Sequence, residues 1–306
     1  MNKLQAWLHA FRLRTLPLAF SSIITGSSLA FVAVRNQFNY TVFALCLLTT
    51  LALQVLSNLA NDYGDSEKGT DNDERVGPKR AVQAGLLTAS EIKTGIVFCS
   101  LFSLAAGFYL IYEATHELHF GYGLFFLFLG LAAIAAAIKY TVGKNAYGYS
   151  GLGDVFVLLF FGFVGVGGSY FLLAHQFNYS LLLPSFALGA FATGVLNLNN
   201  MRDHLSDEKV GKRTLVVKIG LEKAKAYHRL LIILGFIASI AFVILNFNST
   251  MQFLFVITVP LFRRHLLSVR DIFEPKEFDP LLKQLAIGTF IFSILFAVGM
   301  IVGGVE

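Results

Sequence analysis

Long apolar runs separated by short polar segments dominate the pattern along the 306-residue chain. A helix needs about 20 apolar residues to cross a bilayer, and several such runs in one chain must be helices because unpaired backbone groups are too costly in lipid. The pattern therefore predicts an all-α membrane protein with a single integral membrane domain over residues 1–306. Nine runs are long enough, at 15–34, 41–61, 92–112, 121–139, 152–174, 180–200, 228–247, 250–268 and 285–303.

Composition agrees with this pattern. Hydrophobic residues make up 56% of the chain and charged residues 14%, against roughly 45–50% and 25% in soluble domains. The eighth run is the weakest, because Pro260 and the pair Arg263–Arg264 interrupt it, so eight spans remain an alternative. Residues 2–12 mix apolar and basic side chains, and we interpret them as a short interfacial helix that precedes the first span.

The positions of the basic residues predict the orientation. Of the 24 Lys and Arg residues, only Arg35 falls in a loop that follows an odd-numbered span. By the positive-inside rule, the N-terminus and the even loops, about 62–91 and 201–227 among them, are then cytoplasmic. No Arg- and Ser-rich transit segment is visible, so we expect a bacterial inner membrane rather than an organelle. The net charge is +5, and the basic residues lie between the apolar runs. This placement indicates roles in membrane orientation and phosphate binding, and it argues against a nucleic-acid partner.

Two even-numbered spans end in a related polar motif. Residues 61–65 read N-D-Y-G-D and residues 199–203 read N-N-M-R-D, so both fit N-[D/N]-x-x-D. The two motifs are expected on the same side of the membrane. This echo suggests an internal repeat of four plus four helices, followed by a ninth.

Polar residues in each motif region share one helix face. In the first region, Asn58, Asp62 and Asp65 are spaced i, i+4, i+7. In the second, Asn199, Asp203 and Asp207 are spaced i, i+4, i+8. Either spacing puts the three side chains on one side of a helix. Like charges on one face repel, and carboxylates near a membrane core are costly, so a bridging cation would make the arrangement favourable. Oxygen ligands combined with substrate phosphate suit Mg²⁺. The alternative is that these acids only cap helices where the helices meet water.

Basic residues follow both acidic clusters. Lys68, Arg75, Lys79 and Arg80 follow the first, and Lys209, Lys212 and Arg213 follow the second. Acids that hold a metal, surrounded by cations, would form a site for a diphosphate, and Arg80, Lys212 and Arg213 are our candidates for its contacts. The positive-inside rule alone would also put cations here.

Taken together, these motifs resemble the two motifs of the UbiA-type superfamily of intramembrane prenyltransferases, over nearly the whole chain. Four stretches look like the branch that prenylates 1,4-dihydroxy-2-naphthoate and makes demethylmenaquinone. These stretches are residues 12–19, 68–85, 147–154 and 211–220. Many superfamily members carry a further Asp four residues after the position of Asp65; here that residue is Gly69, and Asp71 and Asp73 follow.

The resemblance implies Mg²⁺-dependent transfer of a polyprenyl group from its diphosphate to an aromatic acid, inside a cavity that opens to lipid. It implies that the metal ligands come from Asn58, Asn61, Asp62, Asp65, Asn199, Asp203 and Asp207. Candidates near the acceptor are Arg14, Lys139, Tyr140, Tyr147 and Asp154, with Lys139, Tyr140 and Asp154 as the catalytic candidates. Tyr140 could instead be an ordinary interfacial aromatic, and Asp154 a helix-start acid.

Three other functions remain open from the sequence. A sister enzyme would use another acceptor, such as 4-hydroxybenzoate, homogentisate or haem B. A secondary transporter would place its acids at a repeat interface. A membrane protein without chemistry would leave both acidic clusters unexplained.

Overall fold

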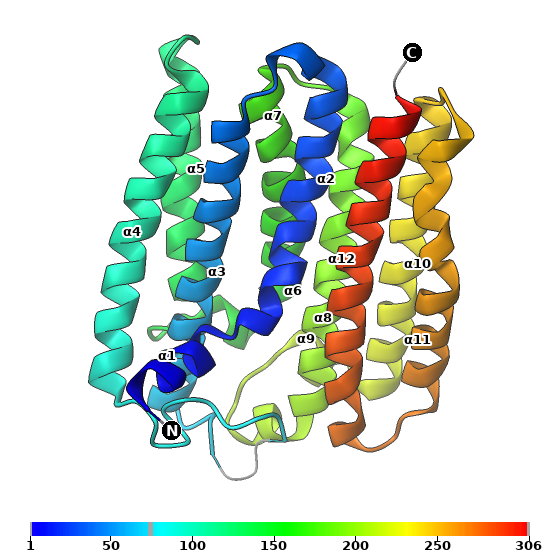
Figure 1. The fold of residues 1–306 in the computed structure, drawn as a ribbon. Helices are drawn as coiled ribbons and strands as arrows, with labels where there is room; N and C mark the ends of the chain where they lie inside the picture. Colours follow the sequence, from blue (N-terminus) through cyan, green and yellow to red (C-terminus); the bar gives the residue numbers. More distant parts are fainter. Residues whose placement is uncertain (1, 73–75, 305–306) are drawn as a thin grey trace.

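The computed structural model describes residues 2–72 and 76–304. Asp73 and Arg75, two of the residues noted in the sequence, lie outside these ranges. Within them the chain is helical, and nine segments are long and apolar enough to cross a membrane, which confirms the predicted number of spans. The described chain begins and ends at opposite ends of the bundle, as an odd number of spans requires (Figure 1).

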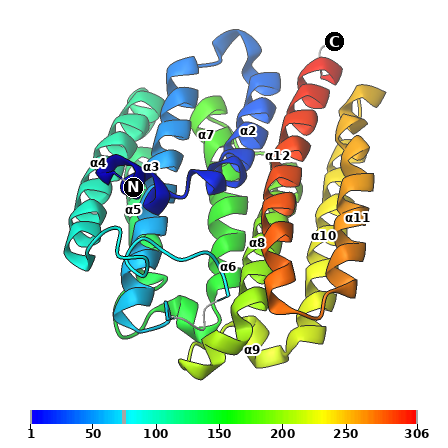
Figure 2. The same cartoon turned by 60° about the horizontal axis from the view of Figure 1, so that its bottom comes forward.

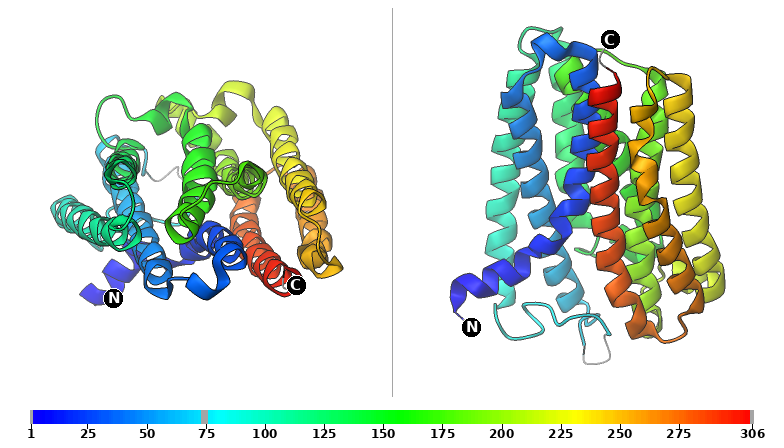
Figure 3. Two further views of the ribbon diagram at one scale, coloured as in Figure 1. Left: turned by 90° about the horizontal axis from the view of Figure 1, so that it is seen from above. Right: turned by 45° about the vertical axis from the view of Figure 1, so that its right-hand side comes forward.

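The first four spans form one side of the bundle. They are α2 (Leu16–Val34), α3 (Tyr40–Glu67), α4 (Ala89–Thr115) and α5 (Phe120–Lys139). The amphipathic segment at the N-terminus is α1 (Lys3–Phe11), which lies across the end of the bundle instead of along it (Figure 3). Its Ala6 and Ala10 are buried against α3 and α4.

The fifth span changes its helix type along its length. It comprises α6 (Gly153–Val157), the π-helical segment η4 (Leu158–Gly168) and α7 (Ser169–Ala174). Close packing of the fifth span against the first and sixth spans depends on small residues. A Cβ on Gly26 of α2 would collide with Val166 of η4, and η4 also packs on the sixth span, α8 (Leu182–Lys209).

The last three spans complete the bundle. They are α10 (Leu221–Leu245), η6 (Thr250–Thr258) continued by α11 (Val259–Asp271), and α12 (Phe278–Gly303). Pro260 does not interrupt the eighth span. It stands in the first turn of α11, where a missing backbone N–H costs nothing. Helix α12 packs on α2, and this contact closes the bundle between its first and last spans.

Both acidic motifs lie at the same end of the bundle, here called the motif end (Figure 2). Helices α3 and α8 continue through their motifs to Glu67 and Lys209, so the connecting segments are shorter than predicted. The first connection is residues 68–88, and the second contains the short helix α9 (Leu215–Ile219).

Candidate active site

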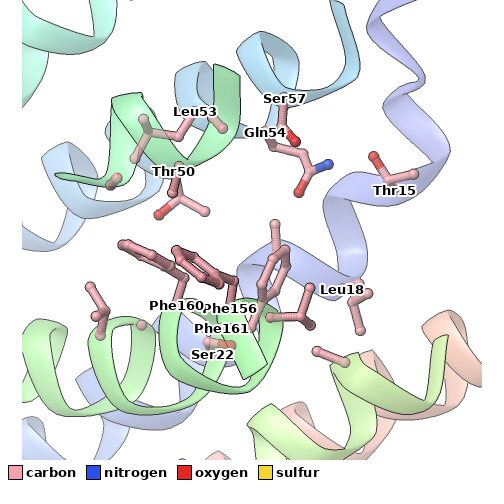
Figure 4. A pocket seen from close by; sticks show the side chains of 18 of the residues that line it. Thr15, Leu18, Ser22, Thr50, Leu53, Gln54, Ser57, Phe156, Phe160 and Phe161 are labelled. Atoms are coloured by element: carbon pink, nitrogen blue, oxygen red, sulfur yellow. The ribbon is translucent and has the colours of Figure 1, made fainter. Parts of the chain in front are cut away.

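A cavity of about 440 Å³ extends from the motif end into the bundle. Spans one to six and α12 contribute to its wall. Its polar end is lined by residues of both motif regions: Asn58, Asn61, Asp65, Arg80, Asn199 and Lys212. Deeper inside, Phe156, Phe160 and Phe161 of the fifth span face Thr50, Gln54 and Ser57 of α3 (Figure 4).

Asp65 is the centre of the first motif. Its carboxylate accepts a hydrogen bond of 2.5 Å from Arg80 Nη1 and one of 2.6 Å from the Tyr149 hydroxyl. Arg80 Nη1 also donates to the Asn61 carbonyl at 2.7 Å and lies 3.1 Å from Asp71 Oδ2. Burial would lower the pKa of Arg80, but the neighbouring Asp65 and Asp71 outweigh burial and raise it. The guanidinium therefore stays charged.

Lys212 connects the two motifs. Its Nζ lies 3.3 Å from Asp207 Oδ1. Burial would lower its pKa, but Asp65 and Asp207 act on it from the two motifs and raise it. Lys212 also lies over the ring of Tyr149, at 5.4 Å from the centroid. Two fixed cations, Arg80 and Lys212, thus border the cavity where the two motifs meet.

Asp203 is already bound within its own helix. Arg202 donates two hydrogen bonds to its carboxylate, from Nε to Oδ1 at 2.8 Å and from Nη2 to Oδ2 at 2.7 Å. The same guanidinium reaches Asn199 Oδ1 at 2.8 Å and Asp279 of α12 at 2.5 Å. This network fixes the motif end of α8 against α12.

The polar residues at the start of the first motif also organise the backbone. Both oxygens of Asp62 accept backbone N–H groups, from Ala81 at 3.0 Å and Val82 at 3.4 Å. Asn58 Nδ2 donates to the Phe11 carbonyl at 2.9 Å and to Thr15 Oγ1 at 3.1 Å, which joins α3 to the α1–α2 connection. The hydrogen bonds from Ala81 and Val82 to Asp62 hold the loop that carries Arg80.

Seven predicted site residues lie outside the cavity lining: Asp62, Asp203 and Asp207 of the motif regions, and Arg14, Lys139, Arg213 and Asp154. Arg14, Lys139 and Arg213 have exposed side chains. Asp154 is buried between α6, α8 and α10, where the Tyr227 hydroxyl contacts its carboxylate. Arg12, not Arg14, lines the cavity, because the chain turns through a left-handed conformation at Arg12 (φ 50°) between α1 and α2.

Two other predicted site residues, Tyr140 and Tyr147, line the cavity. Their rings meet edge to face at 5.4 Å, and Tyr147 stacks on Phe156 at 4.0 Å. Burial, followed by the nearby Asp65, raises the pKa of Tyr140. Its hydroxyl therefore remains protonated and available as a hydrogen-bond donor.

Comparison with known proteins decides the family. The model of the UbiA prenyltransferase family matches residues 19–294. This chain belongs to the UbiA prenyltransferase family. It is 44% identical over 303 residues to a 1,4-dihydroxy-2-naphthoate octaprenyltransferase of Haemophilus influenzae, covering 99% of this chain and 97% of that protein. It is 41% identical to the Escherichia coli protein of the same name, with 98% and 96% covered.

Solved UbiA structures share the fold. A UbiA homolog from Aeropyrum pernix K1 superposes with a TM-score of 0.68 at 14% identity, covering 95% of this chain and 98% of that one. A homolog from Archaeoglobus fulgidus, bound to DMAPP and Mg²⁺, gives 0.63 at 17% identity with the same coverage. These identities support the all-helical architecture and no assignment of individual residues.

The donor atoms in this UbiA site suit a hard cation. Asp207 Oδ2 and Asn200 Oδ1, both in α8, are buried and have no hydrogen-bond partner among residues 2–72 and 76–304. Among the described residues, no three His, Cys, Asp or Glu side chains converge on one point. Mg²⁺ is commonly bound by one or two carboxylates plus water and phosphate, so the residues present fit Mg²⁺ that is held jointly with a diphosphate.

Sequence reasoning missed two contributors to this UbiA site. Tyr149 was not selected although it lies in the stretch 147–154, because only the fold brings its hydroxyl to Asp65. Arg202 was passed over inside the second motif; the available signal was a cation directly beside Asp203 on a helix end.

Proposed function

We propose that this UbiA protein transfers an octaprenyl group from its diphosphate to 1,4-dihydroxy-2-naphthoate, with loss of CO₂. The observation that carries the proposal is that Asp65 and Asn199, one from each motif region, meet Arg80 and Lys212 at the polar end of one cavity whose remaining wall is mostly apolar. The names of the full-length relatives supply the acceptor and the prenyl group. The A. fulgidus homolog, bound to DMAPP and Mg²⁺, supports the metal.

The polar end would bind the diphosphate. Arg80 and Lys212 stay charged and face the point where the motifs meet, so they would contact its oxygens. Asp65 and Asp207 would hold Mg²⁺, which when bound supplies the charge that stabilises the departing diphosphate. Asp62 keeps the Arg80 loop in place, and Tyr149 orients the Asp65 carboxylate.

The apolar part of the cavity would hold the reacting carbon and the acceptor. The allylic C–O bond breaks and its electron pair leaves with the diphosphate. The ring carbon that carries the carboxylate forms the new C–C bond, and loss of CO₂ returns an electron pair to the ring. No proton leaves that carbon, so no strong base is needed there. Phe156, Phe160 and Phe161 exclude the water that would otherwise capture the cation.

We place the motif end in the cytoplasm of a bacterium, with the protein in the inner membrane. The distribution of Lys and Arg supports this orientation. It also gives the polar end of the cavity access to soluble 1,4-dihydroxy-2-naphthoate and Mg²⁺. A transporter would more typically place its polar residues near the midplane, whereas these lie at one end of the spans.

The test is an acceptor panel. Purified protein is incubated with Mg²⁺, octaprenyl diphosphate and either 1,4-dihydroxy-2-naphthoate, 4-hydroxybenzoate or homogentisate, and products are identified by mass. The proposal expects a prenylated naphthalenediol without the carboxylate. Prenylation of 4-hydroxybenzoate alone would reassign the acceptor, and absence of product with every acceptor would refute the transferase.

A further inference from the structure

One side of α10 faces the outside of the bundle, and its character changes along the helix. Exposed side chains recur on this side at helical spacing. Beyond Arg229 the large exposed side chains are apolar: Leu230, Ile233, Ile237, Ile244 and Leu245. Arg229 itself is exposed, and charged residues follow it toward the motif end. The boundary between apolar and charged side chains therefore lies between Leu230 and Arg229.

The eighth span has the same boundary at a similar distance from the motif end. Its large exposed side chains from Met251 to Val259 are apolar, and Arg263 and Arg264 follow, both exposed. Arg229 is the eighth residue after the first residue of α10, and Arg263 is the eighth before the last residue of α11. At 1.5 Å per residue, each arginine lies roughly 12 Å from the motif end of its helix.

A buried contact joins the two helices next to these arginines. Helices α10 and α11 lie side by side at the edge of the bundle (Figures 1 and 3). His228 of α10 and His265 of α11 are buried, and their Nε2 atoms are 3.0 Å apart. Arg229 directly follows His228, and Arg263 and Arg264 directly precede His265. The three exposed arginines, here called the arginine cluster, thus stand outside one helix–helix contact.

The arginine cluster has no acidic partner. Within the described part of the chain, none of its three side chains takes part in an ion pair or a side-chain hydrogen bond. Two acids at the motif end of α10 and α11 are paired with other cations: Glu222 with Lys225 at 2.9 Å, and Asp271 with Arg270 at 2.7 Å. The cluster therefore keeps its full positive charge.

The lengths of the uncharged segments place the cluster at the edge of the hydrocarbon core. Residues 230–245 of α10 carry no charge and span roughly 24 Å. Residues 250–262 also carry none, and with η6 in the longer 3₁₀ rise they span about the same length. The hydrocarbon core is about 30 Å thick, so the arginine backbones lie just inside it. From there a long side chain extends to the level of the lipid phosphates.

We propose that the arginine cluster binds the phosphate of an anionic phospholipid in the leaflet at the motif end, with the acyl chains of that lipid along the apolar sides of α10 and η6. Basic side chains between spans on the cytoplasmic side of a membrane suit such headgroups. A net negative lipid is favoured over a zwitterionic one, because the amine of a zwitterionic headgroup adds a further cation to a site that already holds three. This inference does not depend on the proposed transferase chemistry.

The positive-inside rule does not account for the cluster. That rule places cations in loops, where water solvates them. Arginines within spans usually face the interior of the bundle, and they pair with acids or with backbone carbonyls there. The arginine cluster instead faces the lipid without a partner, so the compensating charge has to come from outside the protein.

The test measures the affinity for single lipids by native mass spectrometry of the purified protein in neutral detergent. Phosphatidylglycerol and phosphatidylcholine with identical acyl chains are titrated separately. The wild-type protein should bind phosphatidylglycerol more tightly. Arg229→Gln combined with Arg263→Gln should weaken that binding by on the order of tenfold, because each cation near the membrane surface contributes to the attraction. Binding of phosphatidylcholine should not change.

Two further double variants serve as controls. Lys93→Gln combined with Lys144→Gln removes the same charge from exposed motif-end positions outside the cluster and should leave phosphatidylglycerol binding unchanged. Arg229→Lys combined with Arg263→Lys keeps the charge and should keep most of the preference. If the double Gln variant yields no folded protein, Arg264→Gln alone should weaken phosphatidylglycerol binding by roughly fivefold.

Three results would overturn the lipid site. The first is an unchanged affinity for phosphatidylglycerol in the folded Gln variants. The second is an equal loss in the Lys93 and Lys144 control, which would show a general effect of net charge. The third is displacement of the lipid by inorganic phosphate at constant ionic strength, which would assign the cluster to a soluble anion.

Discussion

Asp65 and Asp207 occupy equivalent positions at the ends of α3 and α8. Each carbonyl accepts the N–H of the residue five positions later, Thr70 at 2.9 Å and Lys212 at 2.8 Å. A glycine with positive φ follows each Asp by four residues, Gly69 at 68° and Gly211 at 76°. Both helices also have 28 residues. The same C-terminal geometry thus presents one carboxylate from each motif beside the cations at the polar end.

We expect Asp65→Asn and Asp207→Asn each to reduce turnover by on the order of a hundredfold or more, because each removes a charge that would hold Mg²⁺. The measurement is steady-state turnover across a Mg²⁺ titration, with a chelator control. The apparent Mg²⁺ requirement should rise in both variants. Full turnover in chelator would show that no divalent metal is involved.

Tyr149→Phe should reduce turnover by roughly tenfold, since it removes the hydroxyl that donates to Asp65 without changing the ring beside Lys212. Tyr170→Phe is the matched control, because Tyr170 is buried in α7 far along the fifth span from the motif end. Unchanged turnover in Tyr149→Phe would mean that the carboxylate needs no orientation by this hydroxyl.

Gly26→Ala should destabilise the fold by about 1–3 kcal/mol, because its methyl group has to displace Val166 or Ser169. Gly130→Ala is the comparison, since an added Cβ there meets nothing within 4 Å. Thermal unfolding in detergent measures both variants. Equal melting temperatures would show that the α2–η4 crossing adjusts without cost.

Orientation is testable with single cysteines in a background lacking Cys46 and Cys99. Cysteines at the exposed positions Glu67 and Glu208 should react with an impermeant thiol reagent only in inverted vesicles. One at Gln176, exposed at the other end, should react in intact cells. The reverse pattern would put the motif end outside the cytoplasm.

The sequence predicted the spans because lipid imposes a simple rule on every apolar run, and it selected the motif helices because acids are costly there. Which residues of the two motif regions correspond to each other was harder to predict. Matching N-[D/N]-x-x-D pairs Asp65 with Asp203, whereas the helix ends pair Asp65 with Asp207, one turn later. The adjacent positions of Arg202 and Asp203 hinted at a contact, but only the fold shows that Arg202 pairs with Asp203 through both carboxylate oxygens.

Contacts between distant segments account for the other differences. Asp62 bonds to backbone groups that follow it by about twenty positions, and Tyr149 reaches Asp65 from beyond two further spans. Arg14 was the predicted candidate, but a left-handed turn at Arg12, which is uncommon for a non-glycine residue, directs Arg12 and not Arg14 to the cavity. The π-helical stretch has no signal in hydrophobic pattern alone.

The most direct measurement follows the carboxylate of the acceptor. Purified protein is given Mg²⁺, octaprenyl diphosphate and 1,4-dihydroxy-2-naphthoate labelled in its carboxyl carbon, and labelled CO₂ and free diphosphate are quantified together. The account predicts that the two are released in equal amounts, and that Asp65→Asn suppresses both. Diphosphate released without labelled CO₂, or a prenylated product that keeps the label, would contradict it.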